Sequence, residues 1–581
     1  MAEAVIVAAA AASALAIAAL AAATPSGPQP TPKRKSYVVV YEQGVTKAAA
    51  RAAIRAAGGT LVRENARIGV ATVASRNPRF IAAATRDAAL VGAVRNRPMG
   101  RVKPGFIPKV DVDMPAVRRV LNGKQARSAR YRYSKTSSAE PLAGHQWDMR
   151  MIHATPEGSY RKQRGSKRVL VGILDTGVDG NHPDIAPNFS LELSRNFTVD
   201  IPSIDGACAA EADASCNDPA DVDENSHGTH VASTVASPIN GLGTAGVAPG
   251  VTIANLRAGQ DSGFFFLQPS VDALTYAGDN GFDVVNMSYF IDPWLYNCRG
   301  LADDSPTEQA EQVAIIEATQ RALDYAHMHG VTLVGAGGNS RTDLIMPSPV
   351  VDTQSPNFPS GTNHSRTVNN GCLDLPTEGN NVISVSSVGP SKIKSDFSNY
   401  GYGEISVAAP GGWFRDDPWS LSMTAAERTI AGTPNQILAA IPENVARARN
   451  WINPDGSSNT INMIRSCNGS TCGYYQWIQG TSMAAPHATG VAALIVSQFG
   501  ERRGRGITLH PQFTQAFLEA SATDTPCMTP NPFTYTHKGR DASYTTFCEG
   551  TPIYNGVYGH GIVDALSAVA FDADLHHGDQ D

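Results

Sequence analysis

The run RVLVGILDTG at residues 168–177 decides how this chain folds. It is a continuous apolar stretch that ends in Asp175, Thr176 and Gly177. A short apolar run without polar alternation is typical of a strand that is buried on both faces of a parallel sheet. Ligand sites in such sheets lie at the carboxyl ends of the strands. The sequence therefore predicts a buried strand with an acid at its functional end.

Further apolar runs follow and alternate with helical periodicity. The predicted strands are 251–256, 282–287, 331–334, 382–385 and 405–407, and the predicted helices are 311–329 and 483–499. Strands separated by helices predict the α/β class with a doubly wound parallel sheet. Polar, Gly/Pro/Asn-rich stretches near 200–224, 290–308 and 410–470 interrupt the pattern, and we interpret them as surface insertions.

The composition of the chain limits the classes of protein to which it can belong. The chain has 581 residues, of which 42% are hydrophobic, and its 53 Gly and 37 Pro are spread along its length, which excludes a disordered, collagen-like or coiled-coil chain. Residues 33–139 carry 23 Lys and Arg against five acids, a net charge of +18, whereas residues 140–581 carry −23. Opposite charges on one chain predict that the two segments dock on each other, and nucleic-acid binding by the basic segment is the alternative.

The N-terminal region divides into three predicted parts. Residues 1–23, nearly all Ala, Val, Ile and Leu from residue 4 to Ala23, resemble a secretory signal, although Glu3 stands where a base is usual. The alternatives are an Ala-rich helix or a membrane anchor, and the anchor is disfavoured because Ala contributes little to insertion. A Pro-rich linker at 24–35 follows. The pattern of 36–105 then predicts a small ferredoxin-like α+β module in the order β-α-β-β-α-β, and 106–144 form a basic linker.

Eight cysteines all lie after residue 200. An even number in an exported chain favours disulfides, whereas zinc ligation is disfavoured because paired short Cys spacings with His do not occur. Closure between near neighbours predicts the pairs Cys208–Cys216, Cys467–Cys472 and Cys527–Cys548, which leaves Cys298–Cys372.

Two more segments bear reactive side chains at predicted helix starts. NSHGTHVA at 225–232 places His227 there, and GTSMAAPH at 480–487 places Ser482 there. Together with Asp175-Thr-Gly, and in this order, these motifs resemble those of the subtilisin-like serine peptidases over roughly residues 145–500. The α/β-hydrolases have a different order and a G-x-S-x-G elbow that is absent around Ser482.

The resemblance implies a role for each residue. Ser482 is the expected nucleophile, His227 its base and Asp175 the acid that orients His227. Each residue also has an ordinary structural interpretation: Asp175 as a turn former, His227 as one of two metal ligands, and Ser482 as a helix N-cap. We interpret His230 and His487 as structural. The segment VTLVGAGGN at 331–339 is similar to the family's oxyanion segment, which makes Asn339 the expected oxyanion donor; a plain turn is the alternative.

Substrate and metal sites follow from the same resemblance. Peptide is expected to bind as an added strand along Ser288 and Tyr289, where Phe290 replaces a family glycine, with the small Ala336, Gly337 and Gly338 as a second wall. An acidic stretch before His227 favours basic substrates or is simply a solvated loop. It contains Asp205, Glu211, Asp213, Asp218, Asp221, Asp223 and Glu224.

Residues 237–244 resemble a calcium-binding loop of the family. The expected ligands are Asp184 and Asn240, and oxygen-only ligation suits a structural Ca²⁺. A glycine-rich turn with Asp184 as a cap is the alternative.

The expected protein is thus a secreted serine endopeptidase. Residues 36–105 are expected to be an inhibitory propeptide that also assists folding, 106–144 to contain or adjoin the processing site, 145–570 to be the catalytic domain and 571–581 a polar tail. Its expected partners are a protein or peptide substrate and its own propeptide, without nucleic acid and without stable membrane association. A peptidase specific for one precursor and an inactive peptide-binding homologue are the alternatives.

Overall fold

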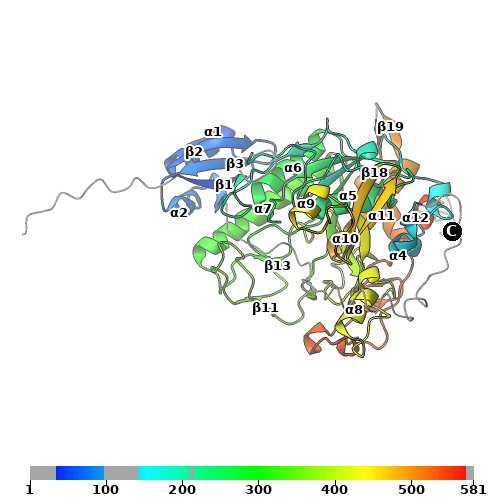
Figure 1. Cartoon of the computed structure of the whole chain (residues 1–581). Helices are drawn as coiled ribbons and strands as arrows, with labels where there is room; N and C mark the ends of the chain where they lie inside the picture. Colours follow the sequence, from blue (N-terminus) through cyan, green and yellow to red (C-terminus); the bar gives the residue numbers. More distant parts are fainter. Residues whose placement is uncertain (1–33, 97–139, 209–214, 505, 571–581) are drawn as a thin grey trace, which may run out of the picture.

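The computed structural model describes residues 34–96, 140–208, 215–504 and 506–570 (Figure 1). The predicted signal segment, the polar tail and nearly all of the linkers 24–35 and 106–144 lie outside the described residues.

A seven-stranded parallel sheet forms the centre of the molecule, in the order β15-β14-β10-β8-β5-β7-β6. Its strands are β5 Leu170–Leu174, β6 Arg195–Asn196, β7 Thr252–Arg257, β8 Val284–Met287, β10 Thr332–Ala336, β14 Val382–Val388 and β15 Val407–Pro410. Five of the six predicted strands overlap the observed ones closely, whereas the sixth, predicted at 405–407, begins only at Val407 as β15; β6 adds a short edge. β5 and β8 are buried along their whole length, as continuous apolar runs predict.

Helices cover both faces of the sheet. α5 (His227–Ala236) and α10 (Thr481–Phe499) pack in one hydrophobic core, and α6 (Leu267–Asp279) and α7 (Pro306–Met328) pack in the other. This confirms the doubly wound α/β prediction. α7 starts five residues before the predicted 311, because Ser305 and Glu308 form a reciprocal capping box there.

Residues 410–470 were expected to be a surface insertion, and for one part of them this prediction is wrong. β16 (Ile437–Ile441), β17 (Met463–Asn468) and β18 (Thr471–Ile478) form an antiparallel sheet in the order β16-β18-β17. β16 is buried at every position, because its apolar residues lie against α5. The other elements after residue 140 are α4 Trp147–Met151, β9 Asn297–Cys298, β11 Val350–Asp352, β12 Arg366–Val368, β13 Cys372–Leu373, α8 Ala425–Gly432, α9 Glu443–Ala448, β19 Glu501–Arg503, β20 Gly506–Thr508, α11 Pro511–Ala520, β21 Gly550–Thr551, β22 Tyr554–Asn555 and α12 Ala565–Ala570.

The N-terminal module has the predicted order of elements. They are β1 Lys35–Tyr41, α1 Lys47–Ala56, β2 Gly59–Asn65, β3 Val70–Ser75, α2 Phe80–Ala84 and β4 Leu90–Arg95, with an antiparallel sheet in the order β2-β3-β1-β4. α1 and α2 cover one face of this sheet. The other face packs on α6 and α7, so the module lies at one end of the molecule (Figure 1).

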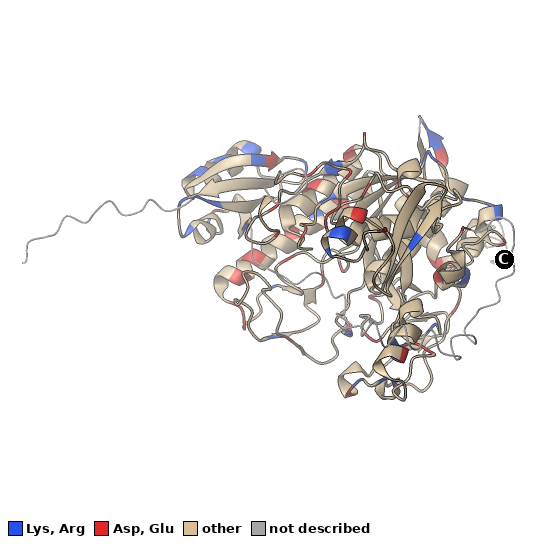
Figure 2. Cartoon of the chain, in the orientation of Figure 1, with Lys and Arg blue, Asp and Glu red and all other residues tan. Residues whose placement is uncertain are grey.

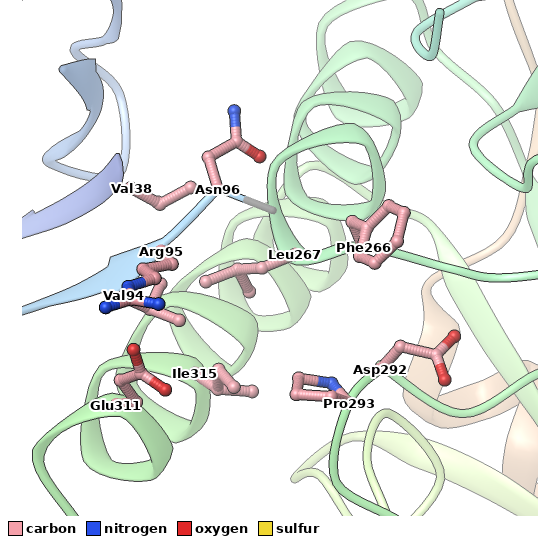
Figure 3. A pocket seen from close by; sticks show the side chains of 10 residues that line it. All are labelled: Val38, Val94, Arg95, Asn96, Phe266, Leu267, Asp292, Pro293, Glu311 and Ile315. Carbon is pink, nitrogen blue, oxygen red and sulfur yellow. The ribbon is translucent and has the colours of Figure 1, made fainter. Parts of the chain in front are cut away.

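Apolar side chains form the centre of that contact. Figure 3 shows a cavity where Val38 and Val94 of the module lie across from Leu267 of α6 and Ile315 of α7. All four side chains are buried or nearly so, and they belong to the same hydrophobic core. The module is therefore held by apolar burial as well as by charge.

Basic side chains of the module meet acids of α6 around this apolar centre. Figure 2 shows that Lys and Arg gather on the module. Arg63 lies 2.9 Å from Asp272, and Arg67 lies 2.8 Å from Asp279. Asn65 also donates to Asp272 at 3.0 Å. These ion pairs join bases of the module to acids of the large domain, as the opposite net charges of the two segments predict.

The first and last elements of the large domain lie together. The N–H of Ala565, at the start of α12, donates to the carbonyl of Ile152 at 2.8 Å, and His153 Nδ1 lies 2.8 Å from Asp564. The four disulfides Cys208–Cys216, Cys298–Cys372, Cys467–Cys472 and Cys527–Cys548 are all present, as predicted. Among the described residues, no helix combines the length and the apolar character that crossing a bilayer requires.

Candidate active site

Asp175 follows directly on β5, at the carboxyl end of the sheet, and is fully buried. Its Oδ1 accepts a hydrogen bond from the N–H of Thr176 at 2.8 Å and lies 2.7 Å from His227 Nδ1. Since a carboxylate only accepts, His227 carries its proton on Nδ1, and Nε2 is left as the basic nitrogen. The structure thus brings together the first two residues of the predicted triad.

Glycine makes this contact possible. A Cβ on Gly228 would lie 2.0 Å from the carbonyl oxygen of Gly177 and 3.0 Å from the Cβ of Asp175. α5 therefore starts against the turn after β5 only because residue 228 has no side chain.

Asp223 holds the start of α5 in place, a role that the sequence analysis missed. Its Oδ2 accepts from the N–H and the hydroxyl of Thr229 at 3.0 and 2.6 Å, and its Oδ1 accepts from the N–H groups of Asn225 and Ser226 at 3.0 Å. Ser226 takes up φ of +94°, a strained conformation for a residue with a side chain. Asp223 is buried, so neither a solvated loop nor a substrate contact describes it.

Opposing effects determine the pKa of His227. Burial, the strongest, lowers its pKa, but the charge and hydrogen bond of Asp175 and the charge of Asp223 together raise the pKa above the ordinary 6.5. Its side chain is 28% exposed, whereas that of Asp175 is 0% exposed. The base is thus open to a substrate while its acid partner is shielded from water.

Ser482 is the second residue of α10, where N–H groups of the first turn have no intrahelical acceptor. Its hydroxyl donates to the carbonyl of Ser288 at 3.2 Å, and the hydroxyl of Ser288 donates back to the carbonyl of Ser482 at 3.0 Å. Within the described residues the Ser482 hydroxyl makes no hydrogen bond to His227. The reciprocal pair ties the start of α10 to the end of β8.

Asn339 is fixed beside Ser482 by its own oxygen. Its Oδ1 accepts from the N–H and the hydroxyl of Thr481 at 2.9 and 3.0 Å. A Cβ built on Gly480 would lie 3.8 Å from both amide atoms of Asn339 and 3.7 Å from the nitrogen of Ser482. The amide thus lies at the α10 start, with Nδ2 available as a donor that brings no charge.

The predicted substrate-binding residues lie at two adjacent strand ends. Met287 of β8 is in register with Gly335 of β10, so Ser288 and Ala336 follow next to each other. The N–H of Gly337 donates to β14, and that of Gly338 donates to the Thr481 hydroxyl.

Tyr289 and Phe290 follow Ser288. Tyr289 turns its ring inward, stacked on Phe265 with 4.1 Å between ring centroids. Its backbone, rather than its side chain, therefore borders this edge of the sheet.

Comparison with known proteins identifies the family of this chain. A model of the subtilase family matches residues 166–561. The chain belongs to the subtilase family. The epidermin leader peptide-processing serine protease EpiP of Staphylococcus epidermidis is 27% identical over 386 residues, covering 65% of this chain and 70% of that protein. Fervidolysin of Fervidobacterium pennivorans is 26% identical over 366 residues, covering 62% of this chain but only 39% of fervidolysin.

Solved structures confirm the fold of this subtilase. EpiP from Staphylococcus aureus matches with a TM-score of 0.57 at 20% identity and covers 93% of this chain and 98% of its own. Fervidolysin matches with a TM-score of 0.54 at 20% identity and covers 94% of this chain and 62% of its own.

The other histidines of the subtilase motifs are structural. His230 is fully buried, and its Nε2 lies 3.1 and 3.0 Å from the carbonyls of Ile437 and Gln476. Burial lowers its pKa to about 3, so it is a neutral donor that ties α5 to β16 and β18. His487 bridges the carbonyl of Met483 and the buried Asp148.

The expected calcium ligands are close together, and their chemistry fits the ion. Asp184 accepts from Asn240 Nδ2 at 3.1 Å and from the N–H of Thr244 at 3.2 Å. Glu140, which the sequence analysis missed, adds a second buried carboxylate; its Oε1 accepts from the N–H of Gly241, and its Oε2 is buried without a partner. Neither acid forms an ion pair within the described residues, and such a set of oxygen ligands suits Ca²⁺.

Two other acidic clusters already hold a cation. Arg257 is buried among Asp200, Asp218 and Asp261. This corrects the interpretation of Asp218, which is neither a solvated acid nor a substrate contact but a buried partner of Arg257. Arg366 is buried in the same way in a second cluster, where it lies 2.8 Å from Asp304 and 2.9 Å from Asp352. Both arginines are structural counter-ions.

Asp205 and Asp221 of the same acidic stretch also bind local groups. Asp205 accepts from the N–H groups of Ile201 and Ser262, and Asp221 accepts from Asn181. Glu211 and Asp213 lie outside the described residues.

Proposed function

We propose that this subtilase is a secreted serine endopeptidase that uses Ser482, His227 and Asp175. The observation that carries the proposal is the 2.7 Å contact between Asp175 and His227, which leaves Nε2 as a base. That base and the Ser482 hydroxyl both lie at helix starts on the carboxyl side of the sheet. A nucleophile, a base and an acid that orients the base are the parts that acyl transfer requires.

The reaction proceeds in two halves. Ser482 releases the Ser288 carbonyl and turns its hydroxyl to His227 Nε2, which takes the proton as the oxygen attacks the scissile carbonyl. The oxyanion that forms is stabilised by the N–H of Ser482 and by Asn339 Nδ2. His227 then protonates the departing amine. Water, deprotonated by His227, attacks the acyl carbonyl. The ester bond to Ser482 then breaks, His227 returns the proton to the Ser482 oxygen, and the acid product leaves.

A role in processing one precursor is the second candidate. EpiP and the nisin protease NisP of Lactococcus lactis, 27% identical over 379 residues, are both named for leader-peptide processing. Peptide profiling on a denatured proteome separates the two candidates, because a processing enzyme cuts few sites and a digestive one cuts many.

The N-terminal module acts as a propeptide, and Ca²⁺ as a structural ion. The burial of Val38 and Val94 against α6 and α7 supports intramolecular docking. Asp184, Glu140 and Asn240 would hold the ion and fix the loop after α5. The predicted signal segment and the four disulfides support export.

Covalent labelling tests the activity directly. A fluorophosphonate probe should label the wild-type protein at Ser482 and leave Ser482→Ala unlabelled, because only an activated serine reacts. A folded, processed protein that resists the probe would support an inactive peptide-binding homologue instead.

A further inference from the structure

A carboxylate without a partner lies behind the wall of the proposed substrate site. Asp374, directly after β13, is only 3% exposed. Within the described residues, its carboxylate accepts no hydrogen bond and has no cation nearby. Burial raises its pKa to about 8. A buried carboxylate in this state is costly unless something pairs with it.

Its position links Asp374 to the reaction. A Cβ built on Gly338 would lie 2.8 Å from Asp374 Oδ2 and 2.3 Å from the Asn399 amide nitrogen. Gly338 directly precedes Asn339, the proposed oxyanion donor, and adopts φ of +94°. The carboxylate therefore lies directly behind Gly338, a residue of the proposed substrate wall that has no side chain.

Acidic groups surround Asp374. Glu378 accepts from the N–H of Asp374 at 2.5 Å, and its pKa is raised by burial and then by the charges of Asp374 and Glu404. The other titratable group facing this cluster is Tyr296, whose hydroxyl donates to Thr342. Within the part of the chain that the structure describes, no Lys or Arg lowers the pKa of Asp374 or Glu378.

We propose that Asp374 forms the base of the pocket for the residue on the amino side of the scissile bond, and that it selects Lys or Arg there. This rests on the proposed function of the site. Ala336, Gly337 and Gly338 place no large side chain between Asp374 and the proposed substrate site. The cationic end of Lys or Arg would supply the charge and the donors that Asp374 lacks. An acid at the base of such a pocket selects basic residues by charge pairing.

The test compares chromogenic peptides that differ only in that residue: Arg, Lys, Phe, Leu or Glu. The wild-type chain should prefer Arg and Lys. Asp374→Asn, which keeps the shape, should reduce the ratio of kcat/KM for Arg over Phe about 100-fold, because one partner of a buried charge pair is lost. Glu378→Gln, the matched control, should change that ratio far less.

The pH dependence gives a readout that does not need a variant. Between pH 7 and 9, KM for the Arg peptide should fall as Asp374 ionises, whereas KM for the Phe peptide should not. Dividing one profile by the other removes the titration of His227, which both substrates share. A wild-type protein that prefers Phe or Leu, or equal effects of Asp374→Asn on all peptides, would overturn the proposal.

Labelling of Ser482 separates this proposal from the function on which it rests. A protein that reacts with the fluorophosphonate but shows no preference for Arg or Lys refutes only the role of Asp374. A folded, processed protein that does not react refutes the peptidase activity, and the assignment of Asp374 falls with it. A thermal unfolding transition of Asp374→Asn checks that the variant is folded, so a changed substrate preference can be assigned to the lost charge.

Discussion

At the scale of residues, the site depends on a buried acid, Asp175, and a partly exposed base, His227. Asp175 is shielded by the turn after β5, and its charge acts on His227 through 2.7 Å without water between them. Because burial alone would lower the pKa of His227, the acid determines that the imidazole titrates above 6.5. Activity should therefore be lost as the pH falls through that raised pKa, where the base becomes protonated.

Asp175→Asn should reduce kcat by about 10⁴-fold, because the amide no longer holds the tautomer that leaves Nε2 basic. The pH below which the remaining activity is lost should also move downward, because burial then dominates the pKa of His227. Rate profiles from pH 5 to 9 measure both effects. Asp283→Asn, a buried acid at the opposite end of β5, is the control. An unchanged profile in Asp175→Asn would contradict the assignment.

The residues that the sequence identified are those whose chemistry is local. Asp175 ends an apolar run, and His227 and Ser482 begin helices, so each is visible within ten residues of sequence. Asp374 is not, because its importance comes from Gly338, which is distant in sequence and joined to it only by folding. Asp223 is one of several acids in its stretch of sequence, and only the five hydrogen bonds that its carboxylate accepts in the fold distinguish it.

At the scale of elements, helix starts position the reactive groups. α5 begins with a strained Ser226 and has no cap from that side chain, so Asp223 provides both the acceptors and the negative charge. β16 was missed because its five apolar residues lie within a stretch rich in Gly, Pro and Asn. The run ILAAI at 437–441 was the available signal.

Asp223→Ala should lower the free energy of unfolding by about 1–3 kcal/mol, because buried donors lose their acceptor. It should also lower kcat, since His227 is the first residue of α5. Thermal unfolding and peptide hydrolysis measure the two effects. Asp221→Ala, which removes one hydrogen bond to Asn181, should have a much smaller effect. Equal effects of the two variants would contradict this account of the α5 start.

Chelation should destabilise the loop after α5. If Ca²⁺ binds Asp184, Glu140 and Asn240, an ion concentration 100 times its Kd stabilises the fold by about 2.7 kcal/mol. Chelator should lower Tm, and Ca²⁺ but not Mg²⁺ should restore it. Asp184→Asn should remove the response to Ca²⁺. A wild-type Tm that does not respond to chelator would refute the calcium proposal.

At the scale of the whole molecule, the N-terminal module and the large domain meet through an apolar centre with charges at its edge. The apolar part is insensitive to salt, whereas exposed ion pairs are screened, with a Debye length of about 10 Å at 0.1 M and 3 Å at 1 M. Docking should therefore weaken with salt but not disappear.

Segment 36–105 added to the mature enzyme should inhibit it more tightly at low salt. Reversing Arg63 and Arg67 to Glu should weaken inhibition and remove most of its salt dependence, because both arginines face acids of α6. The same reversal at the exposed Arg76 and Arg79 controls for net charge. An inhibition constant indifferent to salt and to all four substitutions would contradict the role of these ion pairs.

The contact between Ala565 and Ile152 has a consequence for synthesis. The last helix of the large domain contacts its first segment, so the hydrogen bond to Ile152 forms only after Ala565 has been synthesised. During translation, Ser482 is added to the chain before Ala565, so the nucleophile is present before the large domain is complete. A chain whose synthesis has passed Ser482 but has not reached Ala565 therefore lacks one of the contacts that complete the large domain.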